Sequence, residues 1–172
     1  MHLNKYMAFT LVELAITVLV LSILISLALP YYHQIKANQE RSAIFRQIST
    51  NILLAKQQAV IHHKNVVICS TQDMQTCQEA MWNRGFLVFI DTNKNRQINL
   101  NEVVISTEST NLEYGTLNWR GTLRFPSLNF LAEHGLPIGS NGSFYYCSTS
   151  IKNMKIILNK MGHLRSEDLS SC

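Results

Sequence analysis

The chain has 172 residues, which is room for one folded domain and one membrane anchor but not for two independent hydrophobic cores. Its formal net charge of +4 is modest and is not concentrated in any long run, so charge alone does not predict a nucleic-acid-binding protein. Hydrophobic residues make up 47% of the chain, as in ordinary globular proteins, but many of them lie in one block near the N-terminus.

That block covers residues 9–29, and Glu13 is its only charged residue. As a helix it would extend about 32 Å, which matches the hydrocarbon core of a bilayer. A secretory signal has a shorter apolar stretch with a small-residue cleavage site after it, whereas here the small residue Ala8 comes before it. We therefore expect residues 1–8 to be a leader, and residues 9–29 to be a transmembrane helix that stays on the mature protein.

Glu13 is an unusual residue for a membrane helix. A carboxylate costs about 2.5–3.5 kcal/mol at the centre of a bilayer and less near its edge, so it needs a partner or a route to water. Cleavage after Ala8 would create an α-amino group on Phe9, and Glu13 of one subunit could then neutralise the Phe9 amine of a neighbour. The alternative is that Glu13 lies at the membrane interface and reaches water itself.

The run FTLVE from Phe9 to Glu13, followed by an apolar helix and Pro30, resembles the signature of type IV pilins and pseudopilins. The resemblance implies that a prepilin peptidase cleaves before Phe9 and N-methylates it, and that Glu13 guides docking onto other pilins. It also implies an inner-membrane anchor with a periplasmic head, which becomes extracellular in the assembled filament. The family usually has Gly before the cleavage site; Ala8 stands there in this chain, and because Ala is small we expect cleavage at a lower rate.

Pro30 lacks an N–H group and is expected to kink or interrupt the helix. Over residues 30–63 the sequence predicts an amphipathic continuation of the helix, which reaches Val60 or His62 and lays one face on a sheet. Its apolar residues recur mostly at steps of three and four: Ile35, Ile44, Phe45, Ile48, Ile52, Ala55 and Ala59. We expect the pair His62-His63 in the following turn rather than in a metal site.

Residues 64–172 are predicted to form a β-rich head. Short runs of β-favouring residues are separated by turns that contain Gly, Asn or Ser. A long helix followed by strands at hairpin spacing predicts an α+β fold with a mostly antiparallel sheet. The predicted strands are Val66–Cys69, Phe86–Ile90, Val103–Thr107, Leu112–Leu117, Thr122–Phe125, Ser143–Cys147 and Lys155–Leu158.

Several motifs in the head narrow the resemblance to the FimT/GspH group of minor pilins and pseudopilins. They are VICS at residues 67–70, WNRGFLVFID at 82–91, GSFYYC at 142–147, and KIIL at 155–158 before GHLR at 162–165. Together with the N-terminal signature, the similarity covers nearly the whole chain. It implies a minor subunit of a type IV pilus or of a type II secretion pseudopilus that primes the filament or lies at its tip; the sequence does not choose between the two systems.

The head contains four cysteines, Cys69, Cys77, Cys147 and Cys172. An even number behind an exported segment predicts two disulfides formed in an oxidising compartment. A structural zinc site is less favoured, because Cys69 and Cys77 lack the short spacing of zinc ligands. The sequence alone leaves three connectivities open. The resemblance implies the pairs Cys69–Cys77 and Cys147–Cys172.

The segment from Asp91 to Glu102 partly matches an EF-hand calcium loop. Oxygen donors stand at several liganding positions: Asp91, Asn93, Asn95, Asn99 and Glu102. However, Arg96 occupies the position where the loop requires Gly, and Lys94 and Arg96 add positive charge beside only two carboxylates. We therefore expect a polar hairpin turn and no metal site, with a calcium loop as the alternative.

The sequence contains no recognisable catalytic motif. It has no Gly-x-Ser-x-Gly elbow, no His-Glu-x-x-His and no phosphate-binding loop, and its cysteines are expected to form disulfides. We therefore expect neither an enzyme nor a cofactor.

Basic residues gather near the C-terminus: Lys152, Lys155, Lys160, His163 and Arg165. FimT-like minor pilins of naturally transformable bacteria are associated with DNA binding through a C-terminal Gly-Arg-x-Arg motif, and the similar run here is GHLR, from Gly162 to Arg165. His163 replaces an Arg and is largely neutral at pH 7, and two acidic residues follow at 167 and 168. The resemblance thus implies DNA uptake through a C-terminal loop as an alternative function, against a solvated loop with scattered charges.

Overall fold

The computed structural model describes residues 10–172, so the predicted processing site, Ala8 and Phe9, lies outside the described residues. The described part contains one α-helix followed by eight β-strands, which confirms the predicted α+β class. The chain divides into two compact units, residues 1–36 and residues 37–172.

Helix α1 spans Leu11–His62, and by length and composition it contains a stretch that is apolar enough to cross a membrane. All side chains of residues 11–36 are exposed in the single chain. The hydroxyls of Thr17, Ser22 and Ser26 donate to backbone carbonyl oxygens three residues earlier, at 2.7–2.8 Å. This internal pairing suits an apolar surrounding, in which an unpaired hydroxyl is costly.

Pro30 lies inside α1 and does not interrupt it, so of the two predicted effects the interruption is wrong and the kink stays a prediction. The fixed φ of proline is compatible with a helix, and its ring removes one backbone hydrogen bond while the neighbouring turns keep theirs. The helix ends at His62, one of the two predicted ends, and His63 begins the turn with a φ of 49°. Of the pair predicted in the turn, His63 therefore lies there and His62 belongs to the helix.

From residue 37 onward, one face of α1 is buried in the head. Ile44, Ile48 and Ile52 are 1–3% exposed, and Ala59 is fully buried. Their spacing of three and four residues places them on one side of the helix, as the sequence predicts. Ile35 departs from the prediction, because it belongs to the N-terminal unit and is exposed.

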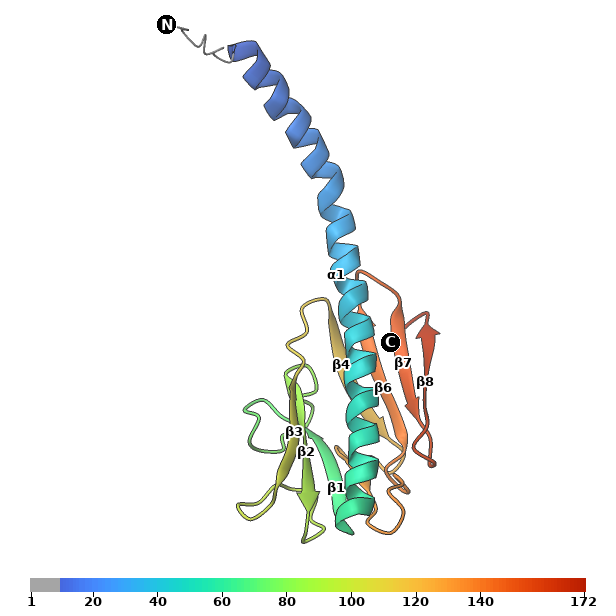
Figure 1. The fold of residues 1–172 in the computed structure, drawn as a ribbon. Coiled ribbons are helices and arrows are strands. Elements are labelled where there is room, and N and C mark those ends of the chain that lie inside the picture. The colour runs from blue at the N-terminus through green and yellow to red at the C-terminus, as the bar shows by residue number, and fades with distance from the viewer. Residues whose placement is uncertain (1–9) are drawn as a thin grey trace, which may run out of the picture. The chain divides into compact units, whose positions relative to one another are not determined.

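The strands form two four-stranded sheets, in the orders β3-β2-β1-β5 and β4-β6-β7-β8. Every neighbouring pair is antiparallel. In Figure 1 the two sheets lie side by side, with the C-terminal half of α1 laid along both. The strands are β1 Asn65–Ser70, β2 Gly85–Asp91, β3 Val104–Ser109, β4 Gly115–Gly121, β5 Leu128–Phe130, β6 Gly142–Ser148, β7 Asn153–Leu158 and β8 Leu164–Leu169.

The strands differ from the predictions at four places. The strand predicted at Leu112–Leu117 is displaced, because β4 spans Gly115–Gly121. Residues 122–125, predicted as a strand, form a turn in which the Arg124 N–H donates to Gly121 O at 3.0 Å. The short strand β5 is not predicted, and β8 replaces a predicted C-terminal loop. Neither β5 nor β8 is a run of β-favouring residues; each extends because it pairs with an apolar neighbour, β1 or β7.

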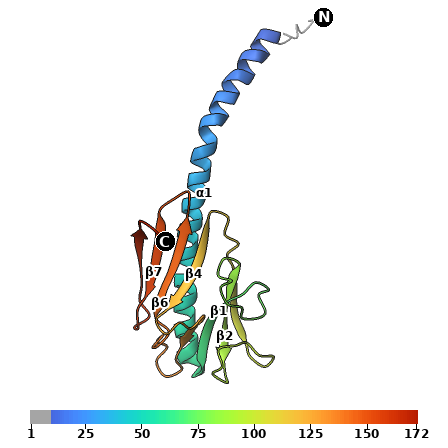
Figure 2. The ribbon, with the colours of Figure 1, turned by 180° about the vertical axis from the view of Figure 1, so that it is seen from behind.

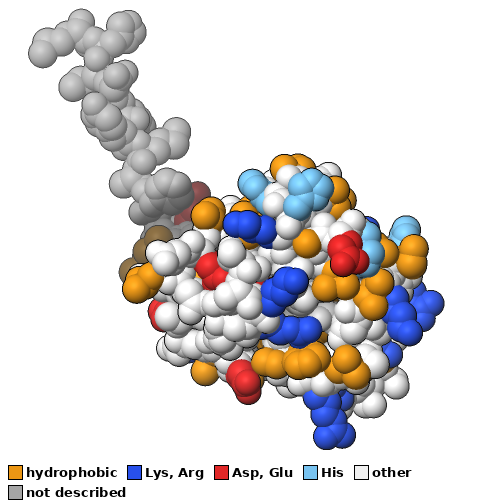
Figure 3. All heavy atoms as spheres, turned by 90° about the horizontal axis from the view of Figure 1, so that it is seen from below, with side chains coloured by type: hydrophobic (Ala, Val, Ile, Leu, Met, Phe, Trp, Pro, Cys, Tyr) orange, Lys and Arg blue, Asp and Glu red, His pale blue; other side chains and the backbone are white. Residues whose placement is uncertain are grey.

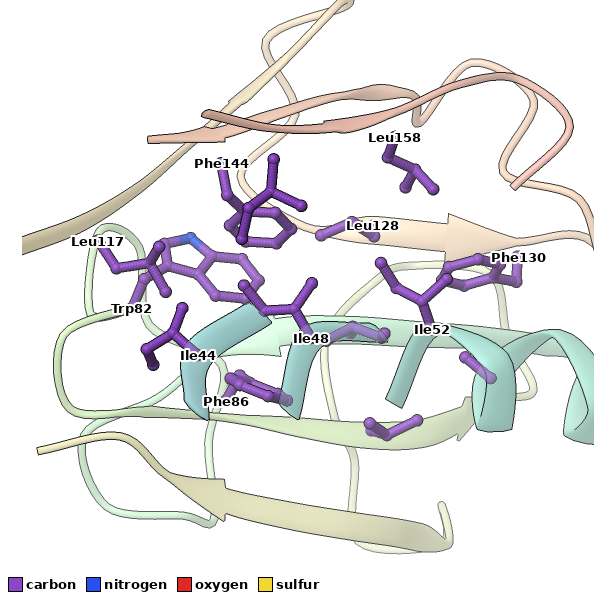
Figure 4. Packing of buried hydrophobic residues seen from close by; sticks show 14 of the residues in the cluster. Ile44, Ile48, Ile52, Trp82, Phe86, Leu117, Leu128, Phe130, Phe144 and Leu158 are labelled. Atoms are coloured by element: carbon purple, nitrogen blue, oxygen red, sulfur yellow. The ribbon is translucent and has the colours of Figure 1, made fainter. Parts of the chain in front are cut away.

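The main core lies between α1 and the inner faces of both sheets. Figure 4 shows Ile44, Ile48 and Ile52 of α1 pointing into this space, with Phe86 and Leu128 on different sides. The rings of Trp82 and Phe144 meet edge to face with their centroids 5.0 Å apart. Since burial of one large apolar side chain contributes about 1.5–3 kcal/mol, this core dominates the stability of the head.

The two sheets differ in the cover over their outer faces. In the first sheet, Val67, Leu87 and Phe89 form a second small core with the partly buried Cys77 and Ile98 of the adjoining loops. Strands β1 and β2 are therefore buried along their whole length. In the second sheet only alternate residues of β6 and β7 are buried, so the face turned away from α1, seen in Figure 2, is open to solvent.

Two disulfides fasten the head. Cys69 and Cys77 close the loop after β1 with a Cα–Cα distance of 5.5 Å, and Cys147 of β6 is bonded to Cys172 with a Cα–Cα distance of 6.0 Å. These are the pairs that the resemblance implies. In the chain-entropy account, a loop of the second size contributes about 3.5 kcal/mol, and it holds the C-terminus against the sheet.

Glu40 of α1 holds the segment that leads into β4. Its carboxylate accepts the N–H of Glu113 at 2.7 Å, the N–H of Tyr114 at 3.2 Å and the hydroxyl of Tyr146 at 2.8 Å. Tyr146 is fully buried, and this burial, together with the hydrogen bond to Glu40, raises the pKa of its hydroxyl. One carboxylate therefore ties the helix to two parts of the second sheet.

We expect Glu40→Ala to lower the free energy of unfolding by about 1–3 kcal/mol, because it leaves the buried Tyr146 hydroxyl and two backbone N–H groups without their acceptor. Urea denaturation of the full chain in detergent micelles measures the loss. Tyr146→Phe is the matched control, with a smaller loss, since the carboxylate then keeps its two backbone donors. Equal losses in the two variants would contradict this role of Glu40.

Candidate functional site

The described part of the N-terminal site consists of the first turn of α1. Thr10 Oγ1 accepts the N–H of Glu13 at 3.3 Å. Thr-x-x-Glu is the spacing of a capping box, and the helix dipole favours a negative charge in this turn. Glu13 therefore helps α1 to begin, and its side chain is exposed on the helix. The capping pattern is visible in the sequence, although our sequence analysis did not use it.

The basic residues of the C-terminal region do not form one loop. Lys155 and Arg165 lie on β7 and β8, whereas Lys152 precedes β7 and Lys160 follows it. A strand of this length spans about 20 Å, so Lys152 and Lys160 are at opposite ends of the second sheet. Figure 3, which views the head from the end where α1 finishes, likewise shows cationic and His side chains spread over the surface.

The turn between β7 and β8 carries Lys160, Gly162 and His163. The side chain of Asn159 shapes it by accepting the N–H groups of Met161 and His163, each at 2.9 Å. Gly162 has a φ of 72°, and a Cβ there would press on the Lys56 side chain at 2.9–3.0 Å.

Lys56 of α1 belongs to this turn in space, which the sequence analysis missed. Its Nζ donates to Met161 O at 3.3 Å. The cluster of basic residues at this turn is therefore formed by two segments that are far apart in the chain. The exposed turn Lys160–His163 and the helix residue Lys56 together make one positive corner of the head.

Lys155 and Arg165 face outward on the second sheet. Met154, Ile156 and Leu158 of β7 are buried in the core, so the intervening Lys155 points to the opposite face. Arg165 pairs in register with Ile157, which also lies on that outer face.

The two acidic residues that follow Arg165 have different partners. Glu167 forms an ion pair with Arg165 at 3.2 Å on the exposed face, where such a pair contributes little stability. Asp168 points the other way and forms an ion pair with Arg41 of α1, whose side chain is 23% exposed. Asp168 therefore fastens β8 to the helix instead of lowering the charge of the outer face.

The segment from Asp91 to Glu102 joins the antiparallel neighbours β2 and β3 as a hairpin. The buried Asp91 carboxylate accepts the N–H of Arg96 at 3.0 Å. Glu102 accepts the N–H groups of Thr92 at 2.8 Å and Asn99 at 3.0 Å. The loop's own backbone thus satisfies both carboxylates.

Arg96 takes up the left-handed conformation for which we expected a glycine to be required. Its φ is 61°, and its guanidinium carbon lies 3.8 Å from the centre of the Phe125 ring. Within residues 10–172, no group of three or more His, Cys, Asp or Glu residues is arranged to hold a metal ion.

Comparison with known proteins places these features in a family. A family model described as "Type II transport protein GspH" matches residues 45–162, which is more than half of the chain. None of the curated proteins matches.

The fold is similar to that of two solved structures. The type IV minor pilin FimU of Pseudomonas aeruginosa has 15% sequence identity and a TM-score of 0.54, over 78% of this chain and 96% of that one. The minor pseudopilin EpsH from the Type 2 Secretion System of Vibrio cholerae has 12% identity and a TM-score of 0.50, over 75% of this chain and 97% of that one. At such identities the likeness establishes the fold alone.

The pairing of Asp168 with Arg41 can be tested by hydrogen exchange. Asp168→Asn should speed amide exchange in β8 about threefold or more, while exchange in β1 and β2 stays unchanged, because only β8 loses its link to α1. Mass spectrometry of the exchanged chain measures both regions. Glu167→Gln is the control, since its ion pair lies on the open face. Equal effects of the two variants would contradict the difference between the acids.

Proposed function

The chain belongs to the family of the type II transport protein GspH, and on this premise we propose that it primes a type IV pilus or a type II secretion pseudopilus, or lies near its tip. It is a minor pilin or pseudopilin, which is a structural subunit and not an enzyme. The observation that carries the proposal is α1 itself, which begins with an apolar membrane-length stretch and ends packed in the head. The function of the protein is therefore non-covalent assembly with other pilins.

The predicted processing fits this function. A prepilin peptidase would remove residues 1–8 and N-methylate Phe9, and the mature helix would anchor the subunit in the inner membrane with its head in the periplasm. In the filament the head would be extracellular. The exposed apolar side chains of residues 11–29 support this anchor, because lipid or neighbouring subunits would have to cover them.

Glu13 supplies the polar contact for assembly. On leaving the membrane, the apolar helix loses its lipid cover and must gain protein cover. The Glu13 carboxylate would neutralise the Phe9 amine of a neighbouring subunit, and one such pair per subunit would set the axial register. This contact acts across subunits, whereas the hydrogen bond between Thr10 and Glu13 acts within one helix.

The exposed face of α1 in the head supports packing between subunits. Leu53, Val60 and Ile61 are 45–65% exposed along the side that faces away from the sheets. Apolar residues in such a row are a surface for a partner of the same kind. Neighbouring subunits of the filament would cover this row together with the anchor.

DNA binding is the second candidate, because one specific arrangement favours it. Lys56 donates to Met161 O in the turn that carries Lys160 and His163, and the outward-facing Lys155 and Arg165 lie on the two strands that this turn joins. Cations spread in this way would contact phosphates without reading bases. The function would be capture of DNA during natural transformation.

The assembly role predicts a filament phenotype. Glu13→Ala should lower the amount of this subunit that co-purifies with sheared filaments at least tenfold, while the head keeps its disulfides and fold. Thr10→Ala is the matched control, since it removes the cap but keeps the carboxylate. The mass of the mature chain verifies processing in both variants. An equal loss of the Thr10→Ala variant from the filaments would indicate that Glu13 acts only by capping the helix.

The DNA role predicts salt-sensitive binding. The full processed chain in neutral detergent should shift a duplex in a gel, with affinity that falls as salt rises by about 0.9 log units per log unit for each phosphate contact. Lys160→Gln should weaken binding, whereas Arg46→Gln on the exposed face of α1 should not. No shift at micromolar protein, or a shift that ignores salt, would eliminate this candidate.

A further inference from the structure

The outer face of the second sheet collects cations from three of its strands. Arg120 of β4 pairs in register with Ser143, Ser143 with Ile157, and Ile157 with Arg165. These four residues form one row across the sheet, on the face opposite the core. Lys155 stands in the adjacent row, so Arg120, Lys155 and Arg165 share one open surface.

Tyr145 stands between two of these cations. Its ring centre lies 4.6 Å from the guanidinium carbon of Arg120 and 5.8 Å from Nζ of Lys155. Strands β4 and β7 flank β6 on opposite sides, so the two cations approach the ring from opposite sides. Stacking on a shared ring restricts both long side chains, and their charges are therefore held in place before any ligand arrives.

The charge balance of the face is positive. Among the outward residues of the four described strands, Glu167 is the one acidic side chain, and it pairs with Arg165 at 3.2 Å. Asp168, the other acid of β8, is turned inward to Arg41. Lys155 lies directly opposite Glu167 in the register of β7 and β8, so this one carboxylate is shared by two cations. The face thus carries Arg120, Lys155 and Arg165 against a single acid and keeps a net positive charge.

We propose that this face binds the phosphate backbone of duplex DNA, with Arg120 and Lys155 as the phosphate-binding residues and Tyr145 as the positioning residue that holds them. The inference rests on the DNA-binding candidate above and assigns it a second surface beside the turn of Lys160. Arg120 and Tyr145 belong to this surface, although neither lies in the C-terminal basic segment.

The dimensions and chemistry of the face fit a phosphate backbone. Arg120 and Lys155 stand on β4 and β7, two strand gaps of about 4.8 Å apart, or about 10 Å in all, which corresponds to about three steps of 3.4 Å along one DNA strand. Of the two residues that lie between Arg120 and Arg165 in their row, Ser143 is polar and Ile157 is apolar. The Tyr145 ring is already flanked on both sides, which favours backbone contact over base stacking.

Fluorescence anisotropy with a labelled duplex and the full processed chain in neutral detergent tests the proposal. Arg120→Gln should weaken binding three- to tenfold and reduce the salt slope by about 0.9. Tyr145→Leu keeps every charge and should still weaken binding at least threefold, whereas Tyr145→Phe keeps the ring and should bind like the wild type. Arg46→Gln, which removes one cation outside this face, is the control for net charge.

The outcomes separate this surface from DNA binding as such. If the wild-type chain does not bind DNA, both the DNA-binding candidate and this surface fail. If it binds but Arg120→Gln and Tyr145→Leu behave like Arg46→Gln, DNA binding stands and this surface is refuted. Because the apolar N-terminal helix alone would bind vesicles, the membrane alternative is tested by comparing variants. Weaker sedimentation of Arg120→Gln than of the wild type with phosphatidylglycerol vesicles, without DNA binding, would assign the face to a membrane and overturn the proposal. Urea denaturation of each variant verifies that the sheet remains folded.

Discussion

The head depends on the buried face of α1, because Ile44, Ile48 and Ile52 are the side chains that both sheets share. Each strand must present its apolar residues to this one helix, so a shift of register by one residue would turn the core residues of that strand toward solvent. Trp82 and Phe144 contact each other in the same core and come from different parts of the chain. The helix therefore fixes the faces of both sheets, and with them the direction of every surface side chain.

Whether loops cover the outer face of a sheet then determines whether a ligand can bind there. The loops after β1 and β2 close over the first sheet, and the disulfide between Cys69 and Cys77 holds the first of these loops in place. In the described part of the head, no loop buries the second sheet in this way. Its outward residues on β6 and β7 are half-buried, and the C-terminal residues reach its outer face where Cys172 is bonded to Cys147. The exposed cations Arg120 and Arg165 lie on this less covered face, whereas the exposed row on α1 is the surface that we propose for contacts between subunits.

The sequence predicted the elements that carry their own apolar pattern. Helix α1 has its stripe of Ile and Ala, and β1 and β2 each contain a run of apolar residues. The family that the sequence motifs indicated is also the family whose model matches the chain. It did not predict β8, whose run LRSEDL becomes a strand only because β7 provides a partner. The cationic site depends on the same pairing. Nothing local in the chain indicates that Arg120 faces Lys155 across Tyr145, or that Lys56 reaches the turn at Gly162.

The pairing of β8 also changes the meaning of the C-terminal motif. A Gly-Arg-x-Arg run in a free tail could wrap both cations around one phosphate. In this chain Gly162 and His163 form a tight turn, Arg165 is already in the strand beside Glu167, and Cys172 is bonded to Cys147 of β6. The C-terminal segment is thus held against the sheet by a strand pairing, an ion pair to α1 and a disulfide. Its cations on β7 and β8 are held apart by the strands, so the polyanion that we propose as a ligand would lie along the sheet and not be wrapped by a tail.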